Sequence, residues 1–476
     1  MSSDTSAMLL NETGGALDRV VGFETEYGFC AEYTNREGEQ VIYSFPESSS
    51  NPQGMPPFKL NQFDNYGNRK YMDIGPHPEF STAEETDFLG AAHRIIIGHL
   101  VVAKIWRENP PFVNGFQSKI HLLANNIDPK FETWGCHENY LASRQLEKEK
   151  YITPLAIHNL SRIVWAGSGV VLRSSRQSQF NFGLSERADH IWDVEHSGTT
   201  RSRPLVNLRD NPYADEKEFR RIHIICGDSV MSPFANALKM ASTSIILRAC
   251  EIGVDFSDLM PANPIKAIRE ISHDPKLQQK VELEDGRKFS GIDLQRAIRE
   301  RAVKAAGKRH YMTAQEKEWA EKWGEVLDDL SVDPQRCLSR VDWVLKRASV
   351  ERELEKADMK ERSTFDVAQT KAFDFHRLLP DEGLGMKLLR SDKQFYESSP
   401  NNEVFEGNMP LPEKTRAKLR ATLLRRIHQL GILSGASWNY LEIDNGKGAT
   451  TLSMGDPSQS ENEELMQKLE EFAKAA

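Results

Sequence analysis

Two acidic residues in the stretch VVGFETEYGF are the first whose types and spacing could do chemistry. Glu24 and Glu26 lie two positions apart in an apolar and aromatic run typical of a strand. Side chains at i and i+2 share one face of a strand, so both carboxylates point the same way. Like charges this close need a proton or a cation between them. The pair predicts a divalent metal ion, with a solvated strand face as the alternative.

A second acidic strand follows in RKYMDIGPHPEFSTAE. Arg69, Tyr71 and Asp73 alternate onto one face, and Glu79 comes shortly after glycine and proline break the strand. An arginine and two carboxylates on one surface are poor core material and are typical of phosphate and metal binding. A surface strand with a salt bridge is the alternative interpretation.

Two further groups carry imidazole and guanidinium side chains. His137 lies in GCHENYLASR, which does not match the zinc-protease pattern HExxH because Leu141 replaces the second histidine. Arg221 and His223 share a face of the predicted strand RRIHIICG, and Arg209 precedes them. A core histidine would explain either imidazole taken alone. The four groups together favour Mg²⁺ and ATP chemistry, in which oxygen ligands hold Mg²⁺ and arginine neutralises phosphoryl oxygens.

Three zones of the chain must position these residues. Residues 19 to about 260 alternate strand-like runs with helical stretches, and the block at about 263–360 shows helical periodicity. Residues 401–476 contain a helical run and the strand-like SWNYLEID, which predicts a small C-terminal domain. We expect an α+β catalytic domain over 19–400 and a flexible tail over 1–18.

Composition excludes several classes of protein. The formal net charge of −9 argues against a duplex nucleic-acid binder, which would need clustered lysine and arginine. The five cysteines are odd in number and form no CxxC, so neither a disulfide framework nor a cysteine-type zinc site is indicated. No apolar run looks long enough to span a bilayer, and the N-terminus lacks signal-peptide features. We therefore expect a cytoplasmic protein without nucleic-acid or membrane partners.

The sequence resembles the Pup ligase family, also called proteasome accessory factor A, and its relative the deamidase of Pup. The collinear blocks run from about Val20 to Asp444: GFETEYG, RKYMDIGPHPEFSTAE, GCHENYLASR, SERADHIW, TTRSRPLVNLRDNPYAD, RRIHIICGDSVMS, NPIKAIREISHD and VDWVLKR. The resemblance implies carboxylate-amine ligase chemistry on a glutamine-synthetase-like fold, with a curved antiparallel sheet as a cradle and a small C-terminal domain. ATP would activate the C-terminal glutamate γ-carboxylate of a small ubiquitin-like protein as an acyl phosphate, which a substrate lysine then attacks.

The resemblance also implies a role for each candidate residue. The implied Mg²⁺ ligands are Glu24, Tyr71 and Glu79, and the implied catalytic base is Asp73. The implied nucleotide contacts are Arg69, Thr82 and Trp438. A looser analogy with glutamine synthetase implies a second metal position at Glu26, His137 and His223, with Arg209 and Arg221 facing the phosphates.

The ligase branch of the family is favoured over the hydrolase branch. In this family the depupylase branch carries an extra loop between the two acidic strands, and the interval from Tyr27 to Asn68, 42 residues, has the shorter length expected of the ligase branch. A depupylase or deamidase of the same fold is the alternative, and a catalytically silent binding protein is a third hypothesis. The partners implied are a small modifier ending in glutamate, either Pup or a related protein, and lysine-bearing substrate proteins.

The helical block offers a candidate groove for this modifier. Ile265, Ile268 and Ile271 form an apolar stripe at helical spacing. The basic residues of the block that could rim the groove are Lys266, Arg269, Arg299, Arg301, Lys304, Lys308 and Arg309. A stripe that faces the core, with the charges solvated, is the alternative.

Overall fold

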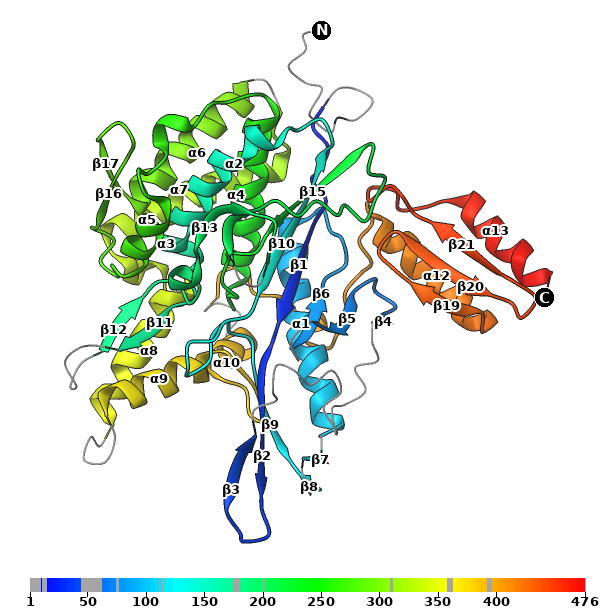
Figure 1. Cartoon of the computed structure of the whole chain (residues 1–476), viewed down its shortest axis with the longest axis horizontal. Helices are drawn as coiled ribbons and strands as arrows, with labels where there is room; N and C mark the ends of the chain where they lie inside the picture. Colours follow the sequence, from blue (N-terminus) through cyan, green and yellow to red (C-terminus); the bar gives the residue numbers. More distant parts are fainter. Residues whose placement is uncertain are drawn as a thin grey trace.

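A sheet of eight strands carries both acidic segments. The computed structural model describes residues 10, 15–43, 62–73, 77–110, 112–113, 115–173, 180–199, 202–308, 311–357, 363–391 and 396–475. In spatial order the strands are β13 (Asp193–His196), β14 (Pro204–Asn207), β15 (Phe219–Ile224), β10 (Cys136–Ser143), β1 (Val21–Glu26), β6 (Pro78–Ser81), β5 (Arg69–Met72) and β4 (Gln62–Phe63). Neighbouring strands are antiparallel except β13 with β14. The central strand is β1, and it crosses the middle of the molecule (Figure 1).

Helices cover one face of this sheet and confirm the α+β class. The helices of this part of the chain are α1 (Phe88–Glu108), α2 (Lys148–Ser161), α3 (Ile163–Ala166), α4 (Pro233–Glu251), α5 (Pro264–Ser272), α6 (Gly291–Lys308), α7 (Ala314–Val332), α8 (Asp342–Lys356) and α9 (Thr364–Phe375). Of these, α1 and α2 contact strands of the sheet, whereas α8 and α9 pack chiefly on each other. Every residue of α4 is buried, as expected for a central helix that packs on α1, α2, α6 and α7. From β1, Val21 and Phe23 enter this core. The opposite face of β1 is therefore the one that carries Glu24 and Glu26.

The predicted helical block is present, and its apolar stripe faces the core. A hairpin of β16 (Lys280–Glu282) and β17 (Lys288–Ser290) separates α5 from α6. Ile268 and Ile271 of α5 are buried in the main core, and Ile265 packs against it. These isoleucines therefore cannot anchor a partner, and the prediction of a groove along them is wrong.

The basic residues of the block are partly engaged with the protein itself. Arg299 donates to the Ala320 carbonyl at 2.8 Å, and Arg301 pairs with Asp258. On α5, Lys266 is exposed and pairs with Glu270. The Lys308 side chain and Arg309 lie outside the described part of the chain.

A smaller sheet begins where the chain continues from β1 into β2. It consists of β18 (Arg377–Leu379), β9 (Lys119–Leu123), β2 (Gly28–Thr34) and β3 (Gln40–Tyr43), and the β2–β3 hairpin projects from the body (Figure 1). The short remaining elements are β7 (Phe112–Val113), β8 (Phe116–Gln117), β11 (Val170–Arg173), β12 (Phe180–Gly183), α10 (Leu384–Ser391) and α11 (Asn402–Phe405).

The C-terminal elements form a layer with a core of its own. The helix α12 (Arg416–Leu430) is followed by a sheet of β19 (Leu433–Ala436), β20 (Tyr440–Asp444) and β21 (Ala449–Ser453), and then by α13 (Glu463–Lys474). This layer lies at one side of the molecule, next to β4 and β5 (Figure 1). Phe63 of β4 belongs to the same apolar cluster as the leucines of α12. The predicted C-terminal helix and strand are therefore confirmed, and they pack against the edge of the main sheet.

The helix α1 corrects the expectation that no segment could span a bilayer. By length and composition α1 is apolar enough to cross a membrane, but 61% of its most apolar window is buried inside the fold. Its apolar residues pack on β1, β6 and α4, which is the usual reason that a core helix passes this test.

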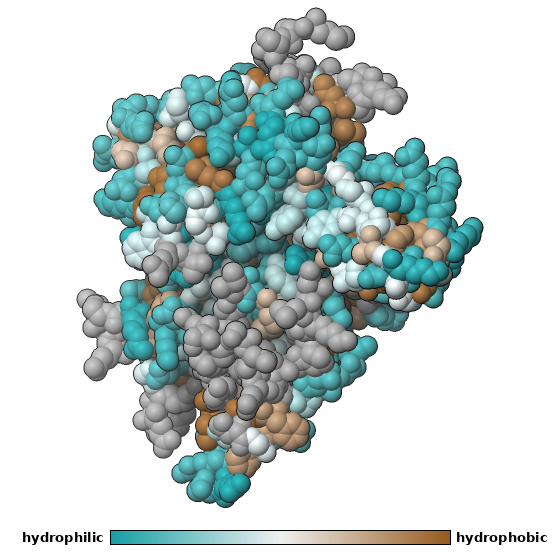
Figure 2. Space-filling view, turned by 45° about the vertical axis from the view of Figure 1, so that its right-hand side comes forward, coloured by the Kyte–Doolittle hydropathy of each residue, from teal (hydrophilic) through white to brown (hydrophobic). Residues whose placement is uncertain are grey.

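On the face shown in Figure 2, hydrophilic side chains predominate and hydrophobic ones are scattered.

Candidate active site

Strand alternation and register bring the predicted acidic residues together on the open face of the main sheet. Phe23 and Thr25 are buried, so Glu24 and Glu26 point to the opposite side. Across the ladder Glu24 is paired with His137 of β10, while Glu26 is paired with Glu79 of β6. The central strand thus contributes one carboxylate to each of two neighbouring groups.

The first group consists of Glu24, His137 and His223, whose ligand atoms lie within 4.8 Å of one another. His137 Nδ1 is 3.0 Å from Glu24 Oε2. Asn139 connects the group, because its amide donates to Glu24 at 3.0 Å and its carbonyl oxygen lies 2.9 Å from His223 Nδ1. The same oxygen accepts a hydrogen bond of 3.0 Å from Arg221.

The second group consists of Glu26, Asp73 and Glu79, again with ligand atoms within 4.8 Å of one another. The Tyr71 hydroxyl donates to Glu79 Oε1 at 2.5 Å. Burial raises the pKa of Tyr71 well above its usual value, and the Glu79 carboxylate adds to this effect, so the hydroxyl remains a donor. Arg69 stacks over the Tyr71 ring, with its guanidinium 4.4 Å from the ring centroid.

The structure corrects the glutamine-synthetase analogy on which glutamate lies beside the two histidines. That analogy placed Glu26 with His137 and His223, whereas Glu24 occupies this position because it is the direct cross-strand neighbour of His137. His137 lies between the two groups, since its Nε2 is 3.7 Å from Glu26 Oε1. Gly135 permits this approach: a Cβ there would come within 2.3 Å of His137 and 2.5 Å of Glu26.

Burial and charge shift the carboxyl groups of this face in opposite directions. Burial raises the pKa of Glu79 well above its usual value, and the carboxylates of Glu24, Glu26 and Asp73 raise it further. Burial acts on Glu24 in the same sense, but the hydrogen bond with His137 and nearby cationic groups outweigh it and lower the pKa of Glu24. A cation that binds beside Glu79 would therefore compete with protonation of this carboxyl group.

Both groups are chemically suited to a divalent cation. Glu26, Asp73 and Glu79 offer only carboxylate oxygen, which matches the preference of Mg²⁺. In the other group, burial lowers the pKa of His223 well below its usual value, and the Arg221 charge lowers it further. His223 is therefore a neutral imidazole, the form that can bind a metal ion, and among the described residues only its Nδ1 has a hydrogen-bond partner.

A cavity of about 80 Å³ opens beside the first group. The main sheet contributes Glu24, Thr82 and Arg221 to its lining, and the C-terminal layer contributes Trp438. Tyr213, from the loop between β14 and β15, is a second aromatic residue of the lining. The cavity is thus shared by the catalytic face and the C-terminal layer.

Three of the predicted nucleotide and phosphate contacts line the cavity: Thr82, Arg221 and Trp438. Thr82 is buried, and its hydroxyl accepts a hydrogen bond from the Phe23 amide at 3.0 Å. The buried Nε of Arg221 has no hydrogen-bond partner among the described residues, so a donor remains for an anionic ligand. Arg69 lies nearby, 6.0 Å from the Trp438 ring. Arg209, by contrast, is exposed in the loop after β14 and does not line the cavity.

Sequence reasoning missed several residues of this site. Asn139 could have been found, because it alternates with His137 onto the same strand face. Tyr213 lies in a loop, and no periodicity marks it. Arg416 and Arg420 are buried, yet in the sequence they resemble the solvated charges of an exposed helix.

The chain is similar to known ligases over most of its length. The Pup-ligase protein family model matches residues 19–442. A Pup–protein ligase from Geodermatophilus obscurus is 33% identical over 458 residues, which cover 94% of this chain and 98% of that protein. The solved structure of the Pup ligase PafA in complex with ADP is 27% identical, with a TM-score of 0.75 and coverage of 87% of this chain and 91% of that chain. The solved complex of the prokaryotic ubiquitin-like protein Pup and its ligase PafA has a TM-score of 0.81 at 24% identity, which shows a shared fold, with coverage of 96% and 93%.

Proposed function

The chain belongs to the Pup-ligase protein family, from which we infer that it is an ATP-dependent ligase that attaches Pup, or a closely related small protein, to substrate proteins. The match of the family model to residues 19–442 and the names of the relatives support this inference. The same names favour the ligase over the depupylase or deamidase alternative. The expectation drawn from the short interval between the two acidic strands points in the same direction.

The observation that carries the proposal is a cavity lined by Glu24 of the first group, by aromatic side chains and by Arg221, whose Nε has no hydrogen-bond partner among the described residues. An adenine nucleotide needs an apolar surface for its base and cations for its phosphates. Trp438 and Thr82 are suited to the nucleoside, while Arg221 and Arg69 are suited to the phosphates. Arg209 would reach the phosphates only after its loop had moved.

The metal ligands proposed are the carboxylates and imidazoles of the open sheet face. They are Glu24, His137 and His223 at one position, and Glu26 and Glu79 at the other, where Tyr71 is hydrogen-bonded to Glu79. The distances between these side chains fit two adjacent cation positions, with His137 between them. Bound Mg²⁺ would spread the negative charge of the transferring phosphoryl group.

The chemistry proposed needs one base from the protein. The modifier γ-carboxylate attacks the terminal phosphoryl group of ATP, so that ADP leaves and an acyl phosphate forms. The lysine amine then attacks the acyl carbon, phosphate leaves, and an isopeptide bond results. The lysine arrives as an ammonium ion and must lose a proton. We propose that Asp73 accepts it, and its position as the least buried carboxylate of the acidic group supports this role.

Three further features complete the proposal. The mostly antiparallel main sheet would form the curved cradle of a glutamine-synthetase-like fold. Residues 19–400 would form the catalytic domain and residues 401–476 the small C-terminal domain. The five free cysteines support a reducing cytoplasmic location.

The nucleotide products test the proposed route. The protein is incubated with Pup, a lysine-bearing target, Mg²⁺ and ATP, and the nucleotides and conjugates are quantified together. We expect one ADP and one phosphate for each isopeptide bond, and no conjugate after chelation of Mg²⁺. Formation of AMP and pyrophosphate would rule out the acyl-phosphate route.

A further inference from the structure

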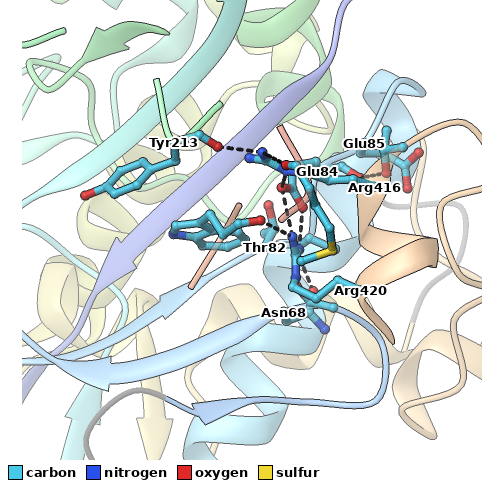
Figure 3. A network of polar contacts seen from close by, with 12 residues as sticks. Asn68, Thr82, Glu84, Glu85, Tyr213, Arg416 and Arg420 are labelled. Atoms are coloured by element: carbon cyan, nitrogen blue, oxygen red, sulfur yellow. Dashed lines mark hydrogen bonds and ion pairs between the residues drawn. The ribbon is translucent and has the colours of Figure 1, made fainter. Parts of the chain in front are cut away.

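Glu84 lies where the main sheet meets the C-terminal layer, five residues after Glu79. Its carboxylate accepts a hydrogen bond of 2.7 Å from Arg416 Nε and one of 3.1 Å from Arg420 Nη1 (Figure 3). The side chains of the two arginines are 4% and 0% exposed, and that of Glu84 is 13% exposed. One buried carboxylate therefore holds two buried cations of α12.

Arg420, which pairs with Glu84, also contacts Trp438. Its guanidinium donates to the Trp438 carbonyl at 3.0 Å and lies 4.9 Å from the centroid of the indole ring. It also donates to the Gly67 carbonyl at 3.0 Å and lies 4.8 Å from the Phe63 ring. Arg420 thus fixes both the backbone and the ring of one aromatic wall of the cavity.

Arg416 makes the corresponding contact with the other wall. It donates to the Tyr213 carbonyl at 2.5 Å and to the Met454 carbonyl at 3.1 Å. Tyr213 has a φ of 49°, a conformation that non-glycine residues adopt only when their surroundings hold them. The hydrogen bond from Arg416 is one of the contacts that hold it.

The backbone beside Glu84 is joined to the strand that carries the catalytic carboxylates. The amide of Thr82 donates to the Phe23 carbonyl at 2.8 Å, and Glu85 and Val21 exchange two backbone hydrogen bonds. The Thr415 hydroxyl also donates to the Glu84 carbonyl at 2.7 Å. Glu84 is therefore held rigidly relative to β1. Through its two arginines it fixes the positions of Tyr213 and Trp438 relative to this strand.

We propose that Glu84 is a positioning residue, which acts through Arg416 and Arg420 to set the spacing of the Tyr213 and Trp438 walls and thereby the affinity for the adenine nucleotide. The inference rests on the proposed nucleotide site in this cavity. The buried ion pair of Lys346 with Glu186, by contrast, contacts Gly169 and Asn126, which do not line the cavity. What distinguishes Glu84 is that both of its partners hold a residue that lines the cavity.

The first test compares Glu84→Gln with Glu85→Gln in the full-length protein. Glu85 is the adjacent residue, has a similarly buried side chain, and pairs with Arg94 of α1 instead of α12. Loss of charge-assisted hydrogen bonds in Glu84→Gln should raise the KM for ATP by about tenfold, with kcat at saturating ATP within about threefold of wild type. Glu85→Gln should lower the melting temperature and leave the KM for ATP unchanged. An equal KM for ATP in wild type and Glu84→Gln would overturn the proposal.

A second variant covers the case in which Glu84→Gln does not fold. Arg420→Lys keeps the positive charge beside Glu84 but loses the planar fork and the stacking on Trp438. It should raise the KM for ATP by a smaller factor, about threefold to fivefold, while the KM for Pup stays the same. A folded Arg420→Lys protein with the wild-type KM for ATP would also overturn the proposal.

Trp438→Ala separates failure of this inference from failure of the proposed nucleotide site. If Trp438→Ala raises the KM for ATP and Glu84→Gln does not, the nucleotide site stands and the positioning role is rejected. If neither substitution changes it, the nucleotide lies elsewhere and the inference fails together with the site. If Glu84 acts through Trp438, the double variant should lose less than the product of the two single effects. Complete additivity would show that Glu84 acts by another route and would overturn the proposal.

Discussion

Glu79 and Glu84 lie five residues apart on one stretch of chain, both with buried carboxyl groups, yet their pKa values shift in opposite directions. Burial raises the pKa of Glu79, and three neighbouring carboxylates raise it further. Burial acts on Glu84 in the same sense, but the charges of Arg420 and Arg416 reverse it and lower the pKa to about 2. The chain supplies its own cations to the carboxylate that joins two layers. Within the described ranges, no ion pair joins a lysine or arginine to Glu79, the carboxylate that we expect to receive a metal ion.

This contrast separates a structural ion pair from a binding site. A carboxylate that already has buried arginine partners gains little from an external cation. A group of carboxylates that repel one another is stabilised much more, because a bound cation offsets their mutual repulsion. The sign of the pKa shift therefore distinguishes two kinds of buried acid that look alike in the sequence.

The largest effect should come from the acidic group itself. Asp73→Asn removes the proposed base but keeps the shape of the side chain, so conjugation should fall by a factor of roughly 10² to 10⁴. Affinity for ATP, measured by calorimetry, should stay close to that of the wild type, and the protein should be no less stable. Conjugation near the wild-type rate would exclude Asp73 as the base.

The opposite behaviour is expected of Glu84. Glu84→Ala leaves Arg416 and Arg420 buried without their partner, which should lower the free energy of unfolding by about 3 to 5 kcal/mol. Chemical denaturation followed by circular dichroism measures this change. A loss below about 1 kcal/mol would mean that water replaces the carboxylate and that the ion pairs contribute little.

Acid should weaken the Glu84 contact in a defined pH range. The pKa of Glu84 in the folded protein, about 2, lies below the ordinary value of 4.5. Its contribution is therefore complete above pH 4.5 and is lost as the pH falls towards 2. Between pH 5 and 3, wild type should lose about 1 to 2 kcal/mol more stability than Glu84→Gln. Parallel curves for the two proteins would contradict the assignment.

The smallest effect, with the opposite sign, is expected at Glu79. Its raised pKa means that its contribution to stability is present at low pH and is lost as the pH rises. Glu79→Gln removes a repelled carboxyl group and keeps an acceptor for Tyr71, so the metal-free protein should gain about 1 kcal/mol. Added Mg²⁺ should stabilise the wild type more than the variant. A variant that is less stable than wild type in the presence of a chelator would remove the contrast with Glu84.

The sequence predicts which side chains of one strand share a face. It does not predict which residues of two strands lie opposite each other. The shared face of Glu24 and Glu26 follows from the two-residue period of a strand, which is a local property. The assignment of Glu24 rather than Glu26 to His137 depends on the register between β1 and β10, which lie far apart in the chain. Local pattern does not determine such long-range pairings.

Helical periodicity had the same limit, because it identifies an apolar stripe without showing what covers the stripe. The isoleucines of α5 were open to two interpretations, and the core was the correct one. In α12, Arg416 and Arg420 recur with the spacing of an ordinary solvated helix face. Only the approach of Glu84, from a segment more than 300 residues earlier, makes them interior residues.

The order of the chain has a consequence for biosynthesis. The carboxylates and histidines of the catalytic face all lie before residue 224, whereas Trp438 and the helix that holds it belong to the last quarter of the sequence. Protein synthesis runs from the N-terminus, so a nascent chain can assemble the metal-binding face long before the second wall of the cavity leaves the ribosome. With the nucleotide site proposed above, a growing chain would bind ATP firmly only once translation is almost complete.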